Sequence, residues 1–290
     1  MAVNEKRLNV TEFDFDNVKD NLKVFLKGQT EFKDYDFEGS GMNILLDTLA
    51  YNTHYLGFNA NMLANEMFLD SSSLRSSVVS HAKTLGYEVT SARAPIATVN
   101  VVLTTDSATK TMPAGTAFST TVDGTNYQFV TTSDVTASNN GGTVSFDSTQ
   151  IYEGTYVTTK FVVDTSDVDQ RFILGDNRAD TSTLTVKIQT SSTDTTATTY
   201  TKATDITQLS STSTVYYLQE VDTGRFEVYF GDGVISRSLS DGNIVILEYV
   251  VTNKTAANGA SSFALSGAIG GFSNVSITTT SNAQGGSEPQ

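Results

Sequence analysis

Few residues of this chain have types and spacing suited to catalysis. Glu227 and Asp232 lie close in sequence, and two carboxylates facing one another about 5–10 Å apart would suit glycoside hydrolysis. However, Asp232 lies between Gly231 and Gly233, and Asp-Gly pairs are first of all hairpin turns because glycine readily adopts positive φ angles. The segment from Phe230 to Gly233 is therefore predicted to be a structural turn of a β region, rather than part of an acid–base pair.

Metal and nucleophile chemistry have little support in the sequence. His54 and His81 are the only histidines, and they fall in separate predicted helices without the carboxylate–histidine spacing of a metal site. The chain has no cysteine, no EF-hand spacing, and no GxSxG, HExxH or phosphate-loop motif. Both histidines are expected to be structural, and the chain is predicted to be a non-enzyme with no cofactor and no metal.

Composition restricts the choice of partners. The net charge is −14 and the sequence pI is about 4.4, which argues against nucleic acid or anionic lipid because both require basic patches. No run of 18 uninterrupted apolar residues occurs, so we expect no membrane insertion. Within 290 residues, a hydrophobic fraction of 38% and a charged fraction of 17% are low for a compact enzyme.

The dominant element is an apolar segment from Gly41 to about Leu69, in which Asp47 is the only formal charge between Ser40 and Asn65. A helix lying on one core shows a single apolar stripe, whereas this segment carries apolar side chains on two sides. One side is leucine-rich and the other is mainly aromatic: Leu45, Leu49, Leu56 and Leu63, then Tyr51, Tyr55, Phe58 and Met62. The rest of the chain offers little apolar surface to cover such a helix, so we expect other chains to enclose it.

Five asparagines lie within this apolar segment. Asn52 and Asn59 are seven residues apart, and polar residues in a helical seam set register and partner number at some cost in stability. The alternative is that both asparagines simply face water. If Asn52 and Asn59 set the register of a helical seam, they belong to the same interface as the leucines.

Shorter helical patterns flank the apolar segment. Residues 16–27 form an amphipathic pattern with Asp16 as the predicted N-cap and Gly28 beyond the end, and Ser40 is a suitable N-cap for the long helix. After Leu69, another helix is expected to end at Gly86. Together with an extended arm over residues 1–15, these elements make a helical arm, residues 1–94, for bundle and partner packing.

Beyond Pro95 the apolar residues mostly alternate, which indicates strands. We expect a first β subregion over 95–200 and a second over 201–290, separated by the low-complexity tract around 191–205. The predicted fold class is α+β multidomain, with a long-helix arm followed by a mainly antiparallel, sandwich- or barrel-like β region. The predicted strands are 97–103, 117–122, 127–131, 142–146, 151–163, 183–189, 215–220, 226–230, 244–252 and 275–279.

Two stretches resemble a known family. FEGSGMNILLDTLAYNTHYLGFNANMLANEMFLDSSSLRSSVVSHAKTLGYEVTSARAP is similar to the N-terminal helical region of the baseplate wedge-ring protein of T-even-type contractile-tailed bacteriophages. EVYFGDGVISRSLSDGNIVILEYVVTNKTAANGA looks like the baseplate J-like pattern, an FGDG hairpin with a following strand through Tyr249 and a later Asn258-Gly259. The resemblance is strong over residues 37–95, moderate over 215–260 and weak between.

The resemblance implies a structural virion subunit, a late protein assembled in the host bacterial cytoplasm into the tail baseplate. In the family, two copies per wedge join other wedge proteins through a helical core bundle and form a ring around the hub, which transmits the contraction trigger. Other wedge proteins and a second copy of the chain are thus the implied partners, in a hetero- and homo-oligomer. Family members usually continue past the GGSEP segment, so we expect either a copy truncated before a C-terminal ring-contact domain or a ring-closing half that lies elsewhere.

A second interpretation remains open at this point. A β region rich in Tyr and Phe, attached to a helical stalk, is also compatible with a receptor- or carbohydrate-binding adhesin. The absence of Trp weakens this interpretation because sugar binding depends on aromatic stacking platforms. Glycan binding by the β region would favour it.

Overall fold

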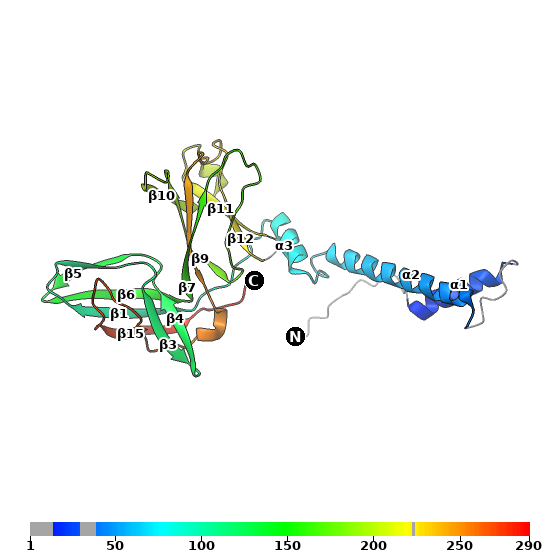
Figure 1. Cartoon of the computed structure of the whole chain (residues 1–290), viewed down its shortest axis with the longest axis horizontal. Helices are drawn as coiled ribbons and strands as arrows, with labels where there is room; N and C mark the ends of the chain where they lie inside the picture. The colour runs from blue at the N-terminus through cyan, green and yellow to red at the C-terminus, as the bar shows by residue number, and fades with distance from the viewer. Residues whose placement is uncertain (1–13, 30–38, 222–223) are drawn as a thin grey trace. The chain divides into compact units, whose positions relative to one another are not determined.

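The computed structural model describes residues 14–29, 39–221 and 224–290 (Figure 1). The chain divides into two compact units, Met1–Tyr87 and Glu88–Gln290, which are described separately below. In the described residues the first unit is helical and the second is built from β-strands, which confirms the predicted order of a helical region before a mainly antiparallel β region. The expected extended arm lies almost entirely outside the described residues.

The helical unit contains α1 (Phe15–Lys27), α2 (Gly41–Glu66) and α3 (Arg75–Thr84). Ser40 caps α2 as predicted, because its side-chain oxygen accepts a hydrogen bond from the Asn43 backbone N–H at 3.1 Å. For α1 the prediction of the start was wrong: the N-cap position is Asp14, and Asp16 lies inside the first turn. An ion pair of 2.5 Å between Lys19 and Asp47 joins α1 to α2.

Glu66, the last residue of α2, caps the start of α3. Its carboxylate accepts hydrogen bonds from the backbone N–H groups of Ser73 (2.9 Å) and Leu74 (3.3 Å) and from the Ser73 hydroxyl (2.8 Å). The backbone carbonyl of Glu66 also contacts His81 Nε2 at 2.9 Å, which gives this histidine a structural role. A side chain from the preceding helix therefore satisfies donors at the α3 N-terminus that its own N-cap residue, Leu74, cannot.

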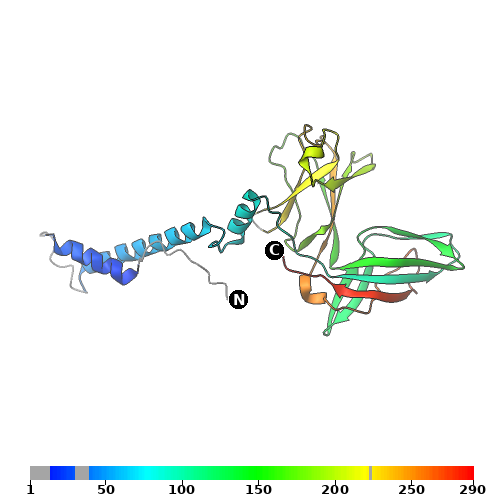
Figure 2. The same ribbon diagram turned by 180° about the vertical axis from the view of Figure 1, so that it is seen from behind.

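The β unit contains two sheets, seen as separate bodies of strands in Figures 1 and 2. The first has the order β14-β3-β4-β6-β1-β15, with β5 pairing to β6 and β2 to β5; the second has the order β7-β13-β9-β10-β11-β12-β8. Their bounds are β1 Ile96–Thr104, β2 Thr109–Met112, β3 Ala117–Val122, β4 Thr125–Val130, β5 Val135–Asn140, β6 Thr143–Glu153, β7 Thr155–Val162, β8 Phe172–Ile173, β9 Ala179–Gln189, β10 Ala197–Lys202, β11 Val215–Glu220, β12 Phe226–Tyr229, β13 Ile244–Val251, β14 Ala264–Leu265 and β15 Ser276–Gln284, with 3-10 helices at Ile206–Gln208 and Lys254–Ala257.

Each sheet has its own apolar core. In the first, alternate residues of β1 point inward, so Val99, Val101 and Leu103 are buried together with Phe118 and Phe129. In the second, one cluster draws apolar residues from nearly every strand. The rings of Phe161 in β7 and Phe172 in β8 lie 5.6 Å apart, so the two ends of the strand order meet and the sheet curls around its core.

Gly154 marks the passage from one sheet to the other. The segment 151–163, predicted as one strand, is instead the end of β6 in the first sheet and β7 in the second. Gly154 has φ +127°, and a Cβ added there would lie 2.2 Å from the Val251 carbonyl oxygen. Only glycine fits this backbone conformation beside a neighbouring strand, which explains why the apolar pattern continues while the strand does not.

The expected division of the β region differs from the observed sheets. The tract around 191–205 was expected to separate two subregions, but it contains β10, which pairs with both β9 and β11 and buries Tyr200. A boundary at residue 200 thus falls inside the second sheet, while β14 and β15 return to the first. The low-complexity pattern concealed β10 because, within that strand, only the Tyr200 side chain is buried.

The boundary between the helical and β regions also lies earlier than the expected residue 94. Residues 88–94 belong to the β unit, where the Ala94 backbone N–H donates to the buried Asp180 carboxylate at 2.8 Å. The Ser91 hydroxyl oxygen likewise accepts from the Thr181 backbone N–H at 2.9 Å. These hydrogen bonds attach the segment to β9.

Candidate partner-binding surface

The two predicted apolar sides of α2 are exposed. All ten residues predicted for the bundle interface are exposed in the chain alone: Leu45, Leu49, Tyr51, Asn52, Tyr55, Leu56, Phe58, Asn59, Met62 and Leu63. Leu56 and Leu63 retain 61% and 70% of their accessible surface. Single exposed leucines are ordinary, but contiguous large apolar side chains along one helix indicate an interaction surface.

Little of α2 is buried by the rest of its unit. Its buried residues are Asn43, Leu46, Ala50 and Gly57, which recur at intervals of three, four and seven and so form one narrow stripe. Helix α1 buries none of its own residues and exposes Val24 and Phe25. At about 1.5 Å per residue, α1 is also roughly half as long as α2, so it cannot cover the whole length of α2.

A further apolar group follows α2 and was not singled out from the sequence as a surface. It comprises Met67, Phe68, Leu69, Leu74, Leu85 and Tyr87, all of which are exposed. Leu74 and Leu85 flank α3 and follow helical spacing in the sequence, but the structure buries only Val79 on this helix. Their helical spacing in the sequence indicates that they lie on one side of a helix. It does not show whether another element covers that side.

The FGDG segment forms a turn, but not a hairpin between neighbouring strands. The Gly233 N–H donates to the Ser236 carbonyl oxygen at 2.9 Å, which closes the turn. The strands before and after it, β12 and β13, are not paired with each other: β12 lies between β11 and β8, and β13 between β7 and β9. The expectation of a β-hairpin here was therefore wrong, since the loop connects two strands of one sheet that have β9, β10 and β11 between them.

The four residues of this turn have distinct surroundings. The Phe230 ring packs edge-on against Phe172 and Tyr200, at centroid distances of 5.7 and 5.6 Å. A Cβ on Gly231 would lie 2.8 Å from the Ser236 carbonyl oxygen, and Gly233 has φ +89°. Both glycines therefore serve the local backbone path, as the sequence predicted for a structural turn.

The carboxylates of Glu227 and Asp232 are engaged separately. Glu227 is nearly buried and accepts two hydrogen bonds from Arg171, at 2.8 and 2.7 Å, and one from Gln219 at 3.1 Å. Asp232 is exposed and accepts from the Val234 backbone N–H at 3.0 Å, a bond that lowers the pKa of Asp232. A carboxylate with a lowered pKa is a poor general acid, and Glu227 is bound in a bidentate ion pair, so neither has the environment of a glycosidase acid.

Within the described ranges, no cluster of three or more His, Cys, Asp or Glu residues could hold a metal ion. None of the described helices is sufficiently long and apolar to cross a membrane.

The buried carboxylate of Glu153 ties the two sheets together. It accepts from the Thr252 hydroxyl (2.7 Å), the Asn253 N–H (2.8 Å) and the Asn253 side-chain amide (2.7 Å).

These features define a class of protein before any comparison. A β unit with two apolar cores of its own is joined to a helical unit whose longest helix leaves two apolar sides uncovered. Neither described unit presents an assembled catalytic group. Exposed apolar surface of this extent along one helix is typical of proteins that pack against other chains.

Comparison with known proteins identifies the family. The model described as "Baseplate wedge protein gp6-like, helical domain" matches residues 14–87, and "Bacteriophage baseplate wedge protein gp6, third domain" matches residues 157–260. The chain is 33% identical over 305 aligned positions to "Baseplate wedge protein gp6" of Enterobacteria phage T4, an alignment that covers 95% of this chain and 45% of that relative. The chain belongs to the gp6-like baseplate wedge family, which confirms the resemblance noted in the sequence.

The matched regions correspond to the structural units. The helical-domain match ends at Tyr87, where the first unit ends, and begins at Asp14, the N-cap of α1. The third-domain match covers most of the second sheet, from within β7 to beyond β13. The chain spans less than half the length of the T4 relative.

Proposed function

We propose that this chain is a structural subunit of a phage tail baseplate wedge, and that α2 is its principal attachment to other wedge proteins. The observation that carries the proposal is the two-sided exposure of α2 in a chain whose β unit buries its own cores. Burying one leucine side chain contributes about 1.5–3 kcal/mol, so a row of four leucines and a facing aromatic side supply ample energy for a helical bundle.

The partners that fit this surface are apolar helices. Helices of another wedge protein would cover one side of α2, and a second copy of this chain would contribute its own α2 to the same bundle. Asn52 and Asn59, both exposed, would set the register of that bundle, because an asparagine in an apolar seam favours one pairing over its alternatives. The T4 relative is a baseplate wedge protein, which supports a wedge assembly, while the arrangement of copies is part of this proposal.

We extend the proposal to the ring around the hub, and family membership supports this extension. Wedges assembled through the helical unit would form a ring around the hub, in the tail baseplate of a virion assembled in the host bacterial cytoplasm. The β unit would then be a rigid body that transmits the contraction trigger between neighbouring subunits. Its two sheets share the Glu153 hydrogen-bond network, which supports rigidity within the unit.

The test compares the purified chain alone with the chain mixed with the other tail proteins of the same phage. Mass measurement by light scattering should show a larger complex on mixing, and amide hydrogen exchange of residues 41–66 should slow by several orders of magnitude because α2 becomes enclosed. An unchanged mass together with unchanged exchange in α2 would refute the proposal.

One structural feature keeps the adhesin alternative testable. Tyr217 and Tyr229 stack at 5.2 Å with an interplanar angle of 21°, and Tyr229 is exposed, so the β unit does present a small aromatic surface. Aromatic faces bind sugars by stacking. Binding of the full chain to a glycan array, abolished by Tyr229→Ala, would favour the adhesin; absence of binding favours the wedge subunit.

A further inference from the structure

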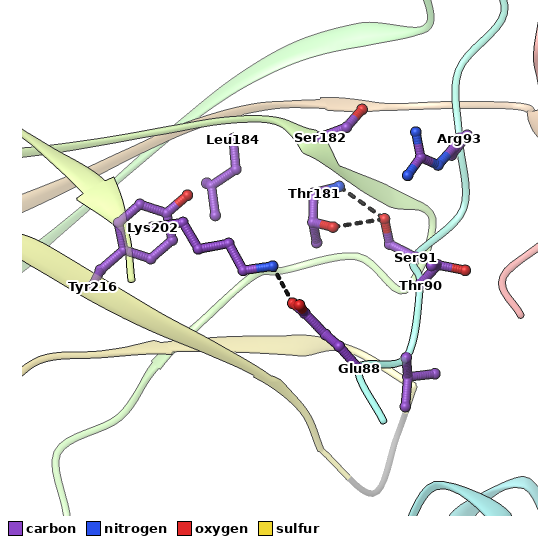
Figure 3. Close-up of a pocket in the computed structure, with 10 residues that line it drawn as sticks. Glu88, Thr90, Ser91, Arg93, Thr181, Ser182, Leu184, Lys202 and Tyr216 are labelled. Carbon is purple, nitrogen blue, oxygen red and sulfur yellow. Dashed lines mark hydrogen bonds and ion pairs between the residues drawn. The ribbon is translucent and has the colours of Figure 1, made fainter. Parts of the chain in front are cut away.

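Polar side chains of the β unit are mostly engaged by one another. In the pocket of about 380 Å³ formed by the segment before β1 with β9, β10 and β11, Lys202 pairs with Glu88, and the Ser91 hydroxyl bonds to Thr181 (Figure 3). Groups paired in this way need no ligand to satisfy them. The tip of the β5–β6 hairpin differs, because Asn140 precedes two glycines there and its side chain is not held.

Two Asn-Gly pairs occur in the chain, Asn140-Gly141 and Asn258-Gly259. This dipeptide is chemically labile, because glycine has no Cβ to hinder the attack of its own backbone nitrogen on the preceding asparagine side chain. All four residues are exposed. Local sequence and solvent access therefore do not distinguish the two pairs, and any difference in reactivity comes from the hydrogen bonds around them.

Asn258 is held on both sides of the bond that would form. Its side-chain amide donates to the Gly286 carbonyl oxygen at 3.1 Å, and its side-chain oxygen accepts from the Gly286 N–H at 3.1 Å. The Gly259 N–H, which must lose its proton to attack, donates to the Ala283 carbonyl oxygen at 2.7 Å. These hydrogen bonds must break before a ring can close at Asn258.

Asn140 lacks these restraints. Within the described part of the chain, its side chain and the Gly141 N–H make no hydrogen bond. Gly141 and Gly142 form the turn at φ +64° and +87°, and nothing lies within 4 Å of a Cβ added at either. The side chain and the turn therefore have room to move toward each other.

The preceding Asn139 does not share this freedom. Its side-chain amide donates to the Ser107 carbonyl oxygen at 3.1 Å, and its side-chain oxygen accepts from the Gly142 N–H at 2.9 Å. It is also followed by a residue with a Cβ, Asn140. Reactivity at this turn is thus expected at Asn140 alone.

We propose that Asn140 is a site of spontaneous deamidation in the folded protein, and that Asn258 is protected. The Gly141 backbone nitrogen attacks the side-chain carbonyl carbon of Asn140, ammonia leaves, and a succinimide ring closes. Water then adds to either carbonyl of the ring and opens it, which gives aspartate or isoaspartate. Overall, one water is consumed and one ammonia is released, so no oxidant or other reactant is required.

Both products alter the tip of the hairpin. Each adds one negative charge to a chain of net charge −14. Isoaspartate also lengthens the backbone by one methylene beside the two residue pairs that join β5 to β6, Asn139 with Val144 and Asn140 with Thr143. Conversion to isoaspartate should therefore disrupt this short pairing and leave the cores of both sheets intact.

The test follows the full chain at mildly alkaline pH in water enriched in heavy oxygen. After digestion in ordinary water, mass spectrometry of the peptides locates each converted asparagine, and the heavy oxygen separates conversion in the folded protein from conversion during digestion. We expect Asn140 to convert at least about tenfold faster than Asn258, because hydrogen bonds protect the latter. In the urea-unfolded chain, where these bonds are absent, the two sites should convert at similar rates.

Two glycine variants of the same turn identify the attacking nitrogen. Gly141→Ala places a Cβ beside that nitrogen and should slow conversion at Asn140 several-fold. Gly142→Ala is the matched control, because it also places an alanine at positive φ in open space but not at the attacking residue. It should leave the rate nearly unchanged.

Equal conversion of Asn140 and Asn258 in the folded chain would overturn the proposal, and so would conversion of neither or conversion at Asn139 instead. Equal slowing by Gly141→Ala and Gly142→Ala would overturn the assigned route, since it would show that the variants act only through the conformation of the turn. None of these results depends on the role proposed for α2.

Discussion

The helical and β units bury their side chains in opposite ways. In the β unit, fully buried residues such as Phe118, Phe146 and Tyr249 fill two cores that the unit supplies itself. In the helical unit, α1 buries no residue and α2 buries four, while its largest apolar side chains face outward. The β unit therefore has the buried cores of a folded domain, whereas the helical unit leaves most of its large apolar side chains exposed, and under the proposed function other chains would bury them.

The largest expected effect separates assembly from folding. Leu56→Asp should weaken wedge assembly by about 100-fold or more, because enclosing a carboxylate among apolar helices costs several kcal/mol, while the β unit stays folded. The matched control is Val168→Asp, which places the same charge at a 93% exposed apolar position of the β unit and should leave assembly unchanged. Co-purification with the other wedge proteins measures both. Normal assembly of Leu56→Asp would contradict the bundle.

The next comparison uses two phenylalanines in the isolated chain. Phe129 is fully buried and packs edge-on against Phe263 at 4.9 Å, so Phe129→Ala should lower the free energy of unfolding by about 3–5 kcal/mol. Phe58 on α2 is 60% exposed, and Phe58→Ala should change the same quantity by less than about 0.5 kcal/mol. Urea denaturation followed by circular dichroism measures both variants. Equal losses would show that α2 is already enclosed within the chain.

Gly154 tests the passage between the two sheets. Gly154→Ala should destabilise the β unit by about 2–4 kcal/mol, because its Cβ would overlap the Val251 carbonyl and its φ is unfavourable. Gly242 also has a positive φ, +76°, but nothing lies within 4 Å of an added Cβ, so Gly242→Ala should cost only about 1 kcal/mol. Thermal unfolding of the two variants gives the comparison. Equal costs would mean that the contact with Val251 is unimportant.

The smallest expected effect concerns the helical unit and depends on pH. Hydrogen bonds from the Ser77 hydroxyl and the Ser73 N–H lower the pKa of Glu66 from its ordinary 4.5 to about 2. A lowered folded-state pKa stabilises the structure above the ordinary value and ceases to do so as the pH falls toward 2. Amide exchange at Ser73 and Leu74 should therefore accelerate between these pH values relative to its intrinsic rate.

Glu66→Gln is the control for this effect. Because glutamine does not ionise in this range, the variant should show the faster exchange already at neutral pH and lose the acid-dependent step. Asp70→Asn removes a carboxylate from the same turn and should retain the wild-type profile. A wild-type profile without the step would refute the capping role of Glu66.

The sequence determined the elements that rest on local periodicity and local caps. The long helix, its Ser40 cap, its two apolar sides, and strands such as 117–122 and 215–220 follow from spacing, since side-chain direction repeats every 3.6 residues in a helix and every two in a strand. The turn at the FGDG segment was also predictable from the sequence, because glycine readily adopts positive φ angles. The sequence also indicated that the chain has little apolar surface with which to cover α2, because this follows from its composition.

Only the tertiary structure decided which strands are neighbours and where each sheet ends. The break at Gly154, the insertion of β10 between β9 and β11, and the separation of β12 from β13 depend on contacts between residues distant in sequence. The pocket around Tyr216 likewise combines the segment before β1 with β9, β10 and β11. Local sequence patterns do not specify such pairings. The free energy that selects them comes from burial and hydrogen bonds between residues that meet only when the chain folds.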